Sequence, residues 1–250
     1  MFKFEHWDEE PRLYNVSTMT DIELRKVLAE CLPEAILKRK GQVLYSGIDT
    51  LRRGDFYFAG FNPAADGTNP ILDDVQLDRR QWSAYIQQCW YHRHRNETCL
   101  KAGQAPHQRR VQSMMSDLGL IPEATFAMNL IFVESQNVAE IKREIRIDGL
   151  FDHCWSVHKK MLAVVRPKFI VCLGNGEYDS AFSLVRKTAN TINNPIHGEE
   201  RVGRYIAFKS FTGTFALNNA PDLTAKVIGV LHPSRWKCPA GMKDFVGKLP

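Results

Sequence analysis

The sequence predicts an α/β protein, in which a mostly parallel sheet of four to five strands forms the middle of a three-layer α/β/α sandwich. Short apolar runs without polar alternation recur along the chain, as expected of strands covered on both faces. Segments with helical periodicity alternate with these runs, and this order favours parallel pairing. The chain has 250 residues, 44% of them hydrophobic, which is enough for one sizeable core in a single domain.

The first predicted helix begins at a capping box, Thr20-Asp21-Ile22-Glu23, and ends near Pro33. A second short helix follows at 35–37, and we interpret residues 1–50 as an N-terminal helical extension. The stretch 87–110 is basic and poor in apolar periodicity, which predicts an insertion or an exposed arm. Further helices are predicted over residues 81–90, 108–118, 150–165 and 177–187.

Apolar runs predict the strands. The first, Phe56 to Phe61, is ended by Asn62-Pro63, because proline has no N–H to donate to a neighbouring strand and holds the preceding residue extended. Asn193-Asn194-Pro195 is predicted to be a turn. The remaining predicted strands cover residues 125–132, 168–174, 205–208 and 226–231.

Composition limits the class of protein. The net charge of +5 and the isoelectric point of about 8.9 fit a polyanionic partner without requiring one. The six cysteines are scattered, which favours a reducing compartment. No apolar run reaches the roughly 18 residues that a membrane span needs, and the N-terminus lacks the apolar core of a signal peptide. We therefore expect a soluble, cytoplasmic monomer with no membrane partner.

Polar side chains follow the predicted strands directly at three places. Asn62 and His232 each stand between an apolar strand and a proline, and Asn129 lies near the end of another strand. Because the carboxyl ends of parallel strands meet at one edge, we expect these three side chains to lie close together. Each also has a plainer interpretation: a turn residue at Asn62, a structural histidine at His232, and a partner for backbone groups at Asn129.

Taken in order, these motifs resemble those of the uracil-DNA glycosylase superfamily. The motifs are Gly60-Phe61-Asn62-Pro63-Ala64, Asn129, Pro167 to Gly174, and His232-Pro233-Ser234. The resemblance spans most of the chain from Gly54 to Ser234 and leaves 1–50 and 87–110 outside. It implies a DNA partner, a flipped pyrimidine whose N-glycosidic bond is hydrolysed, and no cofactor. The iron–sulfur branches use cysteines in positions that this chain does not reproduce, so we expect no cluster.

The resemblance also implies roles for individual residues. His232 would donate to the base carbonyl, where negative charge develops, and Asn62 would hold the attacking water through its carbonyl oxygen. An amide cannot accept the proton of that water as a carboxylate would, and Asp66 is a nearby alternative base. Asn129 would read the Watson–Crick edge of the base. The residues implied to bind the substrate are Phe61, Ala64, Asn129 and Trp82, with Tyr85 as an alternative stacking ring.

The small Ala64 follows the proline of the first motif, where the strictly uracil-specific branch has a bulky tyrosine. It would leave room at C5 for uracil, 5-hydroxymethyluracil or a hypermodified phage cytosine, although it also suits a turn. Trp236 would wedge into the gap left by the flipped base, or it is a surface-packing aromatic. The residues implied to contact DNA are Ser234, Arg235, Trp236 and Lys237.

Other interpretations stay open. A binding module for modified or abasic DNA could use the same fold without turnover. An unrelated hydrolase of a small nucleotide would need a longer phosphate-binding loop than Gly174-Asn175-Gly176. Zinc is conceivable at Cys89, His92, His94 and Cys99, but their spacing matches no common site and a basic arm that touches phosphates is the alternative. The basic runs at 38–40 and 109–110 are interpreted as solvated charge.

Overall fold

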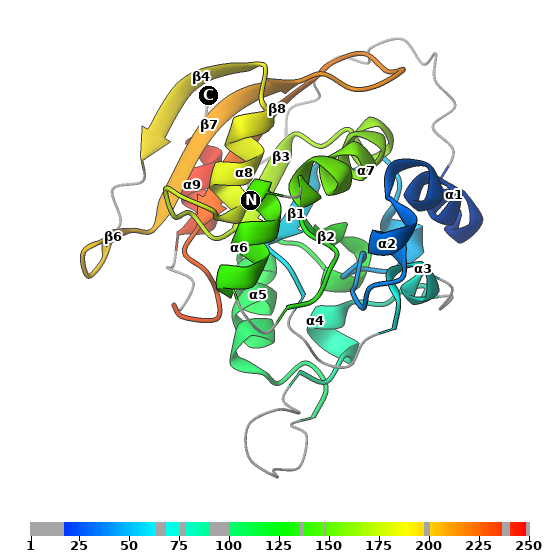
Figure 1. Ribbon diagram of the computed structural model, residues 1–250. Helices are drawn as coiled ribbons and strands as arrows, with labels where there is room; N and C mark the ends of the chain where they lie inside the picture. Colours follow the sequence, from blue (N-terminus) through cyan, green and yellow to red (C-terminus); the bar gives the residue numbers. More distant parts are fainter. Residues whose placement is uncertain are drawn as a thin grey trace.

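The computed structural model describes residues 18–63, 69–75, 79–90, 101–135, 138–147, 149–197, 201–236 and 241–248. Within these residues, the centre of the molecule is a six-stranded sheet with the order β2-β1-β3-β8-β7-β4 (Figure 1). Its strands are β1 (Phe56–Gly60), β2 (Ala127–Asn129), β3 (Phe169–Leu173), β4 (Thr191–His197), β7 (Phe208–Phe215) and β8 (Leu223–Val230).

The sheet is parallel in one part and antiparallel in the other. β1 pairs with β2 and β3, and β3 pairs with β8, all in parallel. β7 runs antiparallel to both β8 and β4. The expected α/β fold with a mostly parallel central sheet is confirmed. The sheet is larger than expected because the strands β4 and β7 extend it beyond β8.

Two predictions in this antiparallel part are wrong. Asn193-Asn194-Pro195 is not a turn but lies within β4, where the pairing with β7 shifts register between Asn193 and Ile196. An edge strand tolerates proline because one side of its backbone needs no partner. The predicted strand at 205–208 is divided, since Tyr205–Ile206 forms β6 of a separate hairpin and β7 begins at Phe208.

Helices connect and cover the strands. They are α1 (Asp21–Cys31), α2 (Glu34–Leu37), α3 (Ile71–Asp74), α4 (Ala84–Gln87), α5 (Pro106–Asp117), α6 (Val138–Ile147), α7 (Leu150–Val165), α8 (Ala181–Thr188) and α9 (Met242–Gly247), with short 3-10 turns at Ile48–Thr50 and Pro122–Ala124. The capping box of α1 is confirmed: the Glu23 N–H donates to Oγ1 of Thr20 at 3.2 Å, and the Thr20 N–H donates to Oε2 of Glu23 at 2.7 Å.

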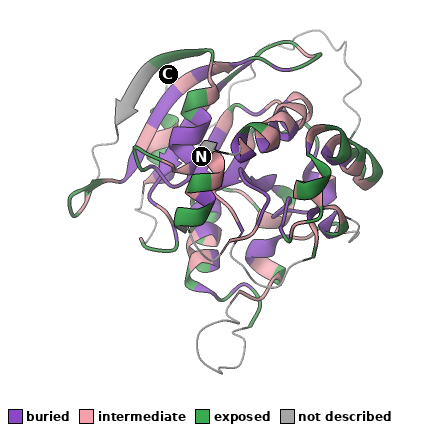
Figure 2. Ribbon diagram, viewed as in Figure 1, coloured by how far each residue is buried: buried purple, intermediate pink, exposed green. Residues whose placement is uncertain are grey.

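Each face of the sheet buries apolar side chains against helices. Alternate strand residues belong to two clusters, because side chains in a strand point to opposite faces. Tyr57 and Cys172 belong to the cluster that includes α1, α7 and α8, whereas Phe58 and Val171 belong to the one that includes α4 and α5. The buried residues follow the strands and the helix sides that face them (Figure 2).

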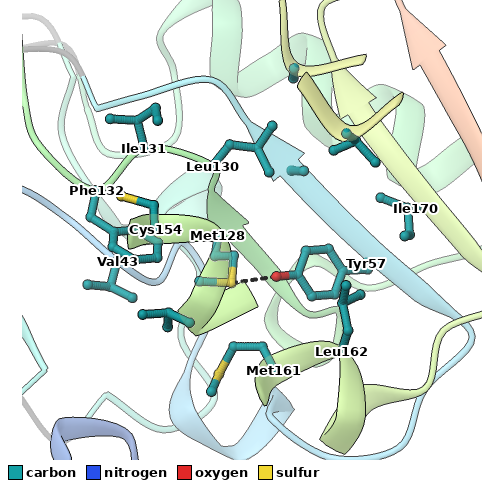
Figure 3. Close-up of a cluster of buried hydrophobic side chains, with 14 of the residues drawn as sticks. Val43, Tyr57, Met128, Leu130, Ile131, Phe132, Cys154, Met161, Leu162 and Ile170 are labelled. Atoms are coloured by element: carbon teal, nitrogen blue, oxygen red, sulfur yellow. Dashed lines mark hydrogen bonds between the residues drawn. The ribbon is translucent and has the colours of Figure 1, made fainter. Parts of the chain in front are cut away.

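A buried polar network lies within the first cluster, and Figure 3 shows its contact between Tyr57 and Met128. The hydroxyl of Tyr57 is 2.8 Å from Sδ of Met128 and 2.6 Å from Nδ1 of His158. Nε2 of His158 lies 3.2 Å from the Leu130 carbonyl oxygen, which can only accept, so Nε2 carries the proton and Nδ1 accepts from Tyr57. Burial lowers the pKa of His158 to about 4. The network anchors the chain just beyond β2.

The described part of the N-terminal region is integrated into the same body. Isolated bridges join Gly41 to Val133 and Leu44 to Met128, so this segment runs antiparallel beside β2. Arg39, which we interpreted as solvated, is instead paired with both carboxylate oxygens of Glu144 on α6. None of the helices in the described ranges combines the length and the apolar character needed to cross a membrane.

A substitution of Gly229 in β8 tests how tightly α8 packs on the sheet. A Cβ there would lie 2.6 Å from Cδ2 of Phe182 and 2.9 Å from Cβ of Asn175. We expect Gly229→Ala to lower the free energy of unfolding by about 1–3 kcal/mol, the range for overpacking in a core, as measured by urea denaturation. Gly54→Ala is the matched control, since its Cβ would come no closer than 3.8 Å to another atom. Equal midpoints for the two variants would contradict the packing described.

Candidate functional site

The parallel strands bring Asn62 and His232 to one edge of the sheet. Ala59, Cys172 and Gly229 lie level with one another across β1, β3 and β8. Asn62 and His232 each follow that level by three residues, one after β1 and the other after β8. Only β3 separates these strands, so their backbones are about 10 Å apart at that level, which is two strand spacings.

His232 lies on the face of the sheet that packs against α4 and α5. Phe58 and Val230, in the strands that precede Asn62 and His232, both lie in the cluster on that face. His107 on α5 supports this placement, because its ring lies edge-on to that of His232 with 5.3 Å between the centroids.

Asn62 presents a carbonyl oxygen. Its side chain is half-buried, and Nδ2 donates to the carbonyl oxygen of Pro63 at 2.9 Å. A carbonyl can only accept, so this contact fixes which end of the amide faces Pro63. No donor among the described residues pairs with Oδ1. The group that the sequence predicted to orient water is therefore available for a ligand.

His232 is held as one neutral tautomer. Nδ1 accepts the backbone N–H of Ser234 at 3.2 Å and lies 2.7 Å from its hydroxyl. A backbone N–H can only donate, so the single proton of the neutral ring is on Nε2. Burial lowers the pKa of His232 to about 4, and the charge of Arg235 acts in the same direction. At neutral pH the side chain is thus an uncharged donor through Nε2.

Asn129 lies deeper than the other two residues. It pairs in register with Gly60 and is only 3% exposed. A Cβ at Gly60 would overlap Oδ1 of Asn129, so the glycine makes the room that the amide occupies. Nδ2 donates to the Gln42 carbonyl over a long 3.4 Å. A ligand would have to enter between the strand ends to reach this amide.

Sequence reasoning missed His107. Its Nε2 is enclosed and has no hydrogen-bond partner among the residues that the structure describes. Burial, with His232 and Arg110 acting in the same direction, lowers the pKa of His107 to about 3. His107 lies within residues 87–110, which are predicted to form an insertion or arm, but α5 begins at Pro106 within this stretch. Proline at a first helical position, with Gln108 accepting from the Ala105 N–H at 3.1 Å, is the start signal that would have found it.

Arg110 joins α5 to the loop that carries His232. Its Nη1 donates to the carbonyl oxygen of Pro233 at 2.6 Å, so the prediction that this side chain is only solvated is wrong. The loop itself turns tightly, because the N–H groups of Arg235 and Trp236 both donate to the His232 carbonyl, at 3.0 and 3.2 Å. The Arg110 hydrogen bond and the two hydrogen bonds within the loop together fix the position of His232.

The two candidate stacking rings differ in position. Tyr85 is buried, and its ring lies 6.4 Å from that of His107 and 5.6 Å from that of Trp90. Trp82 is half-buried and lies under the guanidinium of Arg79, 4.4 Å from its ring centroid. Tyr85 is therefore the ring that belongs to the surroundings of His232.

The remaining predicted site residues are spread more widely. Phe61 packs against the cluster that contains Tyr57. Ser234 and Arg235 are exposed, and Trp236 is half-buried with its ring 4.9 Å from that of Tyr205. Ala64, Asp66 and Lys237 lie outside the described residues.

Of the four candidate zinc ligands, only Cys89 lies within the described residues. Cys89 is disulfide-bonded, so the thiolate that a metal would need is absent there. A disulfide is also typical of oxidising surroundings, which goes against the expected reducing compartment. His92, His94 and Cys99 lie outside the described residues. Among those that are described, no three histidine, cysteine or acidic side chains gather in a way that could hold a metal.

Comparison with protein-family models and with curated proteins finds no match to this chain. We therefore base the functional proposal on the side chains at this edge of the sheet.

The buried histidines predict a loss of stability in acid. The pKa values of His107, His158 and His232 are lowered from 6.5 to about 3, about 4 and about 4. Their contribution is complete above pH 6.5 and declines as the pH falls towards 4, because only the unfolded chain binds the protons. Each adds a slope of up to about 1.4 kcal/mol per pH unit. Burial raises the pKa of Asp74 to about 6, so below that pH the folded chain binds a proton that the unfolded chain does not yet bind. This gain in stability offsets the loss caused by one of the histidines.

Urea unfolding at a series of pH values, for wild type and His107→Gln, measures this effect. Glutamine does not titrate, so the variant should lose stability less steeply between pH 6.5 and 4. Identical slopes would show that His107 is not held neutral in the folded protein.

Proposed function

We propose that this protein is a DNA glycosylase that flips a pyrimidine and hydrolyses its N-glycosidic bond to leave an abasic site. One observation carries the proposal: a neutral His232, with its proton on Nε2, lies at the same edge of the sheet as Asn62, whose Oδ1 pairs with no donor among the described residues. The ordered resemblance to the uracil-DNA glycosylase superfamily supports it. So do the apolar clusters on both faces of the sheet, which suit the three-layer sandwich of that superfamily.

The chemistry needs a donor where the base gains negative charge. As the bond between C1′ and the base nitrogen breaks, its electron pair moves onto the pyrimidine and increases the charge on a ring carbonyl oxygen. An Nε2–H of His232 directed at that oxygen would stabilise the leaving base, and it needs no change of protonation at neutral pH. The lowered pKa of His232 supports this role because it keeps the group neutral.

The second requirement is an oriented nucleophile. Water forms the new bond to C1′, and its oxygen must lie on the side of the sugar opposite to the departing base. Oδ1 of Asn62 would accept one hydrogen bond from that water and hold it in line. The amide does not remove the proton, so the proton of the water leaves to solvent after the bond has formed. A slow enzyme with broad substrate range is the expected result.

The substrate is a pyrimidine read by Asn129. Its amide can offer one donor and one acceptor to a Watson–Crick edge that reaches between the strand ends. The small Ala64 favours a pocket that tolerates substituents at C5, such as those of 5-hydroxymethyluracil or a hypermodified phage cytosine. Such a pocket is compatible both with the repair of uracil in DNA and with antiviral defence. A cytoplasmic monomer is part of the proposal, and it requires that the disulfide at Cys89 persists in a reducing compartment, where disulfides are rare.

A second candidate is a module that binds modified or abasic DNA without turnover. The observation that favours it is the chemistry of Asn62, which supplies an amide where a carboxylate would accept the proton of the water. A module would need the same pocket and the same basic surroundings, but it would release no base.

Base release separates these two candidates. DNAs that contain uracil, 5-hydroxymethyluracil, 5-hydroxymethylcytosine or its glucosylated form are incubated with the protein, and free base is measured by mass spectrometry. We expect release of one of these bases. Asn62→Ala and His232→Ala should each lower the rate by about 100- to 1,000-fold, because each removes a group that acts in the transition state. DNA binding should change little.

His153→Ala is the matched control, since this histidine lies on α7, which packs on the face of the sheet opposite to α5 and His232. No release of any base by folded wild-type protein that binds DNA would reject the glycosylase and favour the module. Equal rates for wild type and His232→Ala would remove the histidine from the mechanism.

Substitutions of Ser234 distinguish between two possible roles of its side chain. The resemblance implies that it contacts phosphate, whereas its hydrogen bonds to Nδ1 imply that it orients His232. Orientation predicts that Ser234→Ala lowers the rate of base release by about tenfold at unchanged DNA affinity, since the backbone N–H remains as a donor. Ser234→Thr, which keeps the hydroxyl, should retain the rate. Weaker DNA binding at an unchanged rate would instead support the phosphate contact.

A further inference from the structure

A small hairpin stands apart from the main sheet. β5 (Arg201–Val202) and β6 (Tyr205–Ile206) pair antiparallel, with Gly203 in a left-handed conformation and Arg204 at the turn. Figure 1 shows β6 extending away from the body of the molecule, at the left of the view. The tip is exposed, and Tyr205 is 40% exposed. A hairpin this short buries too little apolar surface to be stable by itself, so the body of the protein must hold it.

The hairpin emerges beside His232. β7 follows it directly, and Phe208 at the start of β7 pairs with Val230 at the end of β8. The Leu231 N–H donates to the Ala207 carbonyl at 3.2 Å, which fastens the base of the hairpin next to the histidine loop. On the other side, Nδ2 of Asn175 donates to the Ile206 carbonyl at 2.9 Å. The hairpin therefore extends from the same edge that carries the candidate site.

A continuous row of groups leads from His232 to the hairpin tip. Trp236 is linked to His232 through its backbone N–H, and its ring lies 4.9 Å from that of Tyr205. The guanidinium of Arg204 lies over the Tyr205 ring, 5.3 Å from its centroid, and Nη2 is 3.2 Å from the Tyr205 hydroxyl. Two rings and a cation thus form a partly exposed surface next to the site.

The charged side chains in the described part of this surface are all positive. Arg201, Arg204 and Arg235 are exposed, and residues 201–206 and 232–236 contain no acidic side chain. None of the three arginines forms a salt bridge with another described residue. Alternating cations and rings match the alternating phosphates and bases of a nucleic-acid strand, and an acidic peptide would not need the rings.

We propose that the β5–β6 hairpin, together with Trp236, is a nucleic-acid-binding arm that holds a DNA strand beside the candidate site. Tyr205 supplies a face on which an unpaired base stacks, and Arg201 and Arg204 contact the neighbouring phosphates. This inference rests on the proposed glycosylase function. It explains why a tyrosine, and arginines that form no salt bridge with another described residue, occupy a hairpin that contributes no strand to the main sheet.

The test is binding of a fluorescein-labelled duplex with one uracil opposite guanine, measured by fluorescence anisotropy over a range of salt concentrations. Arg204→Ala should reduce the slope of log K against log salt by about 1, because one phosphate contact is lost. Tyr205→Ala should weaken binding by about tenfold at an unchanged slope, because one stacking contact is lost. Tyr205→Phe keeps the ring and should bind like wild type.

Arg53→Ala is the matched control, because this exposed arginine precedes β1 and lies at the opposite edge of the sheet. Thermal unfolding confirms that each variant is folded, as expected for exposed positions. If Arg204→Ala and Tyr205→Ala both bind with the affinity and salt slope of wild type, the hairpin is not a nucleic-acid-binding arm, and the proposed glycosylase function is unaffected. Weakened binding by these variants, in a protein that releases no base, would support the arm and overturn the glycosylase. Failure of wild type to bind the duplex would overturn both.

Discussion

The parallel pairing of β1, β3 and β8, with both faces buried, is the constraint on which the rest of the structure depends. A parallel connection must return the chain to the starting edge of the sheet, and helices that make this return cover the faces. β3 shows the result, since Cys172 packs towards α7 and α8 whereas Val171 packs towards α4 and α5. All three strands then end at one edge, so the polar residues that follow them gather there.

Small residues and burial give that edge its chemical character. Gly60 leaves the space that the amide of Asn129 fills, and Gly229 lets Phe182 press against β8. Packing this close excludes water, so ionised imidazoles are disfavoured. The Ser234 N–H then decides which nitrogen of His232 holds the proton. A neutral donor with a defined direction results from desolvation and one backbone hydrogen bond, without a charged partner.

Much of the fold and part of the candidate site could be predicted from the sequence. β1 and β3 are uninterrupted apolar runs, β8 ends in one, and a proline after Asn62 or His232 shows where the chain must leave the sheet. β4 and β7 were missed or misplaced because Pro195 and the polar residues of β7 hide their pairing, which only the partner strand defines.

The sequence by itself determined where the strands end and which polar side chains stand at those ends. Consecutive residues carry this information, through apolar runs and through prolines that cannot continue a ladder. Only the tertiary structure decided that Tyr85 rather than Trp82 lies beside His107, that His107 lies against His232, and that Arg110 donates to the Pro233 carbonyl from 123 positions away in the chain. The physical reason is that burial, ring contacts and the protonation of an imidazole depend on groups that become neighbours only when α5 docks on the sheet.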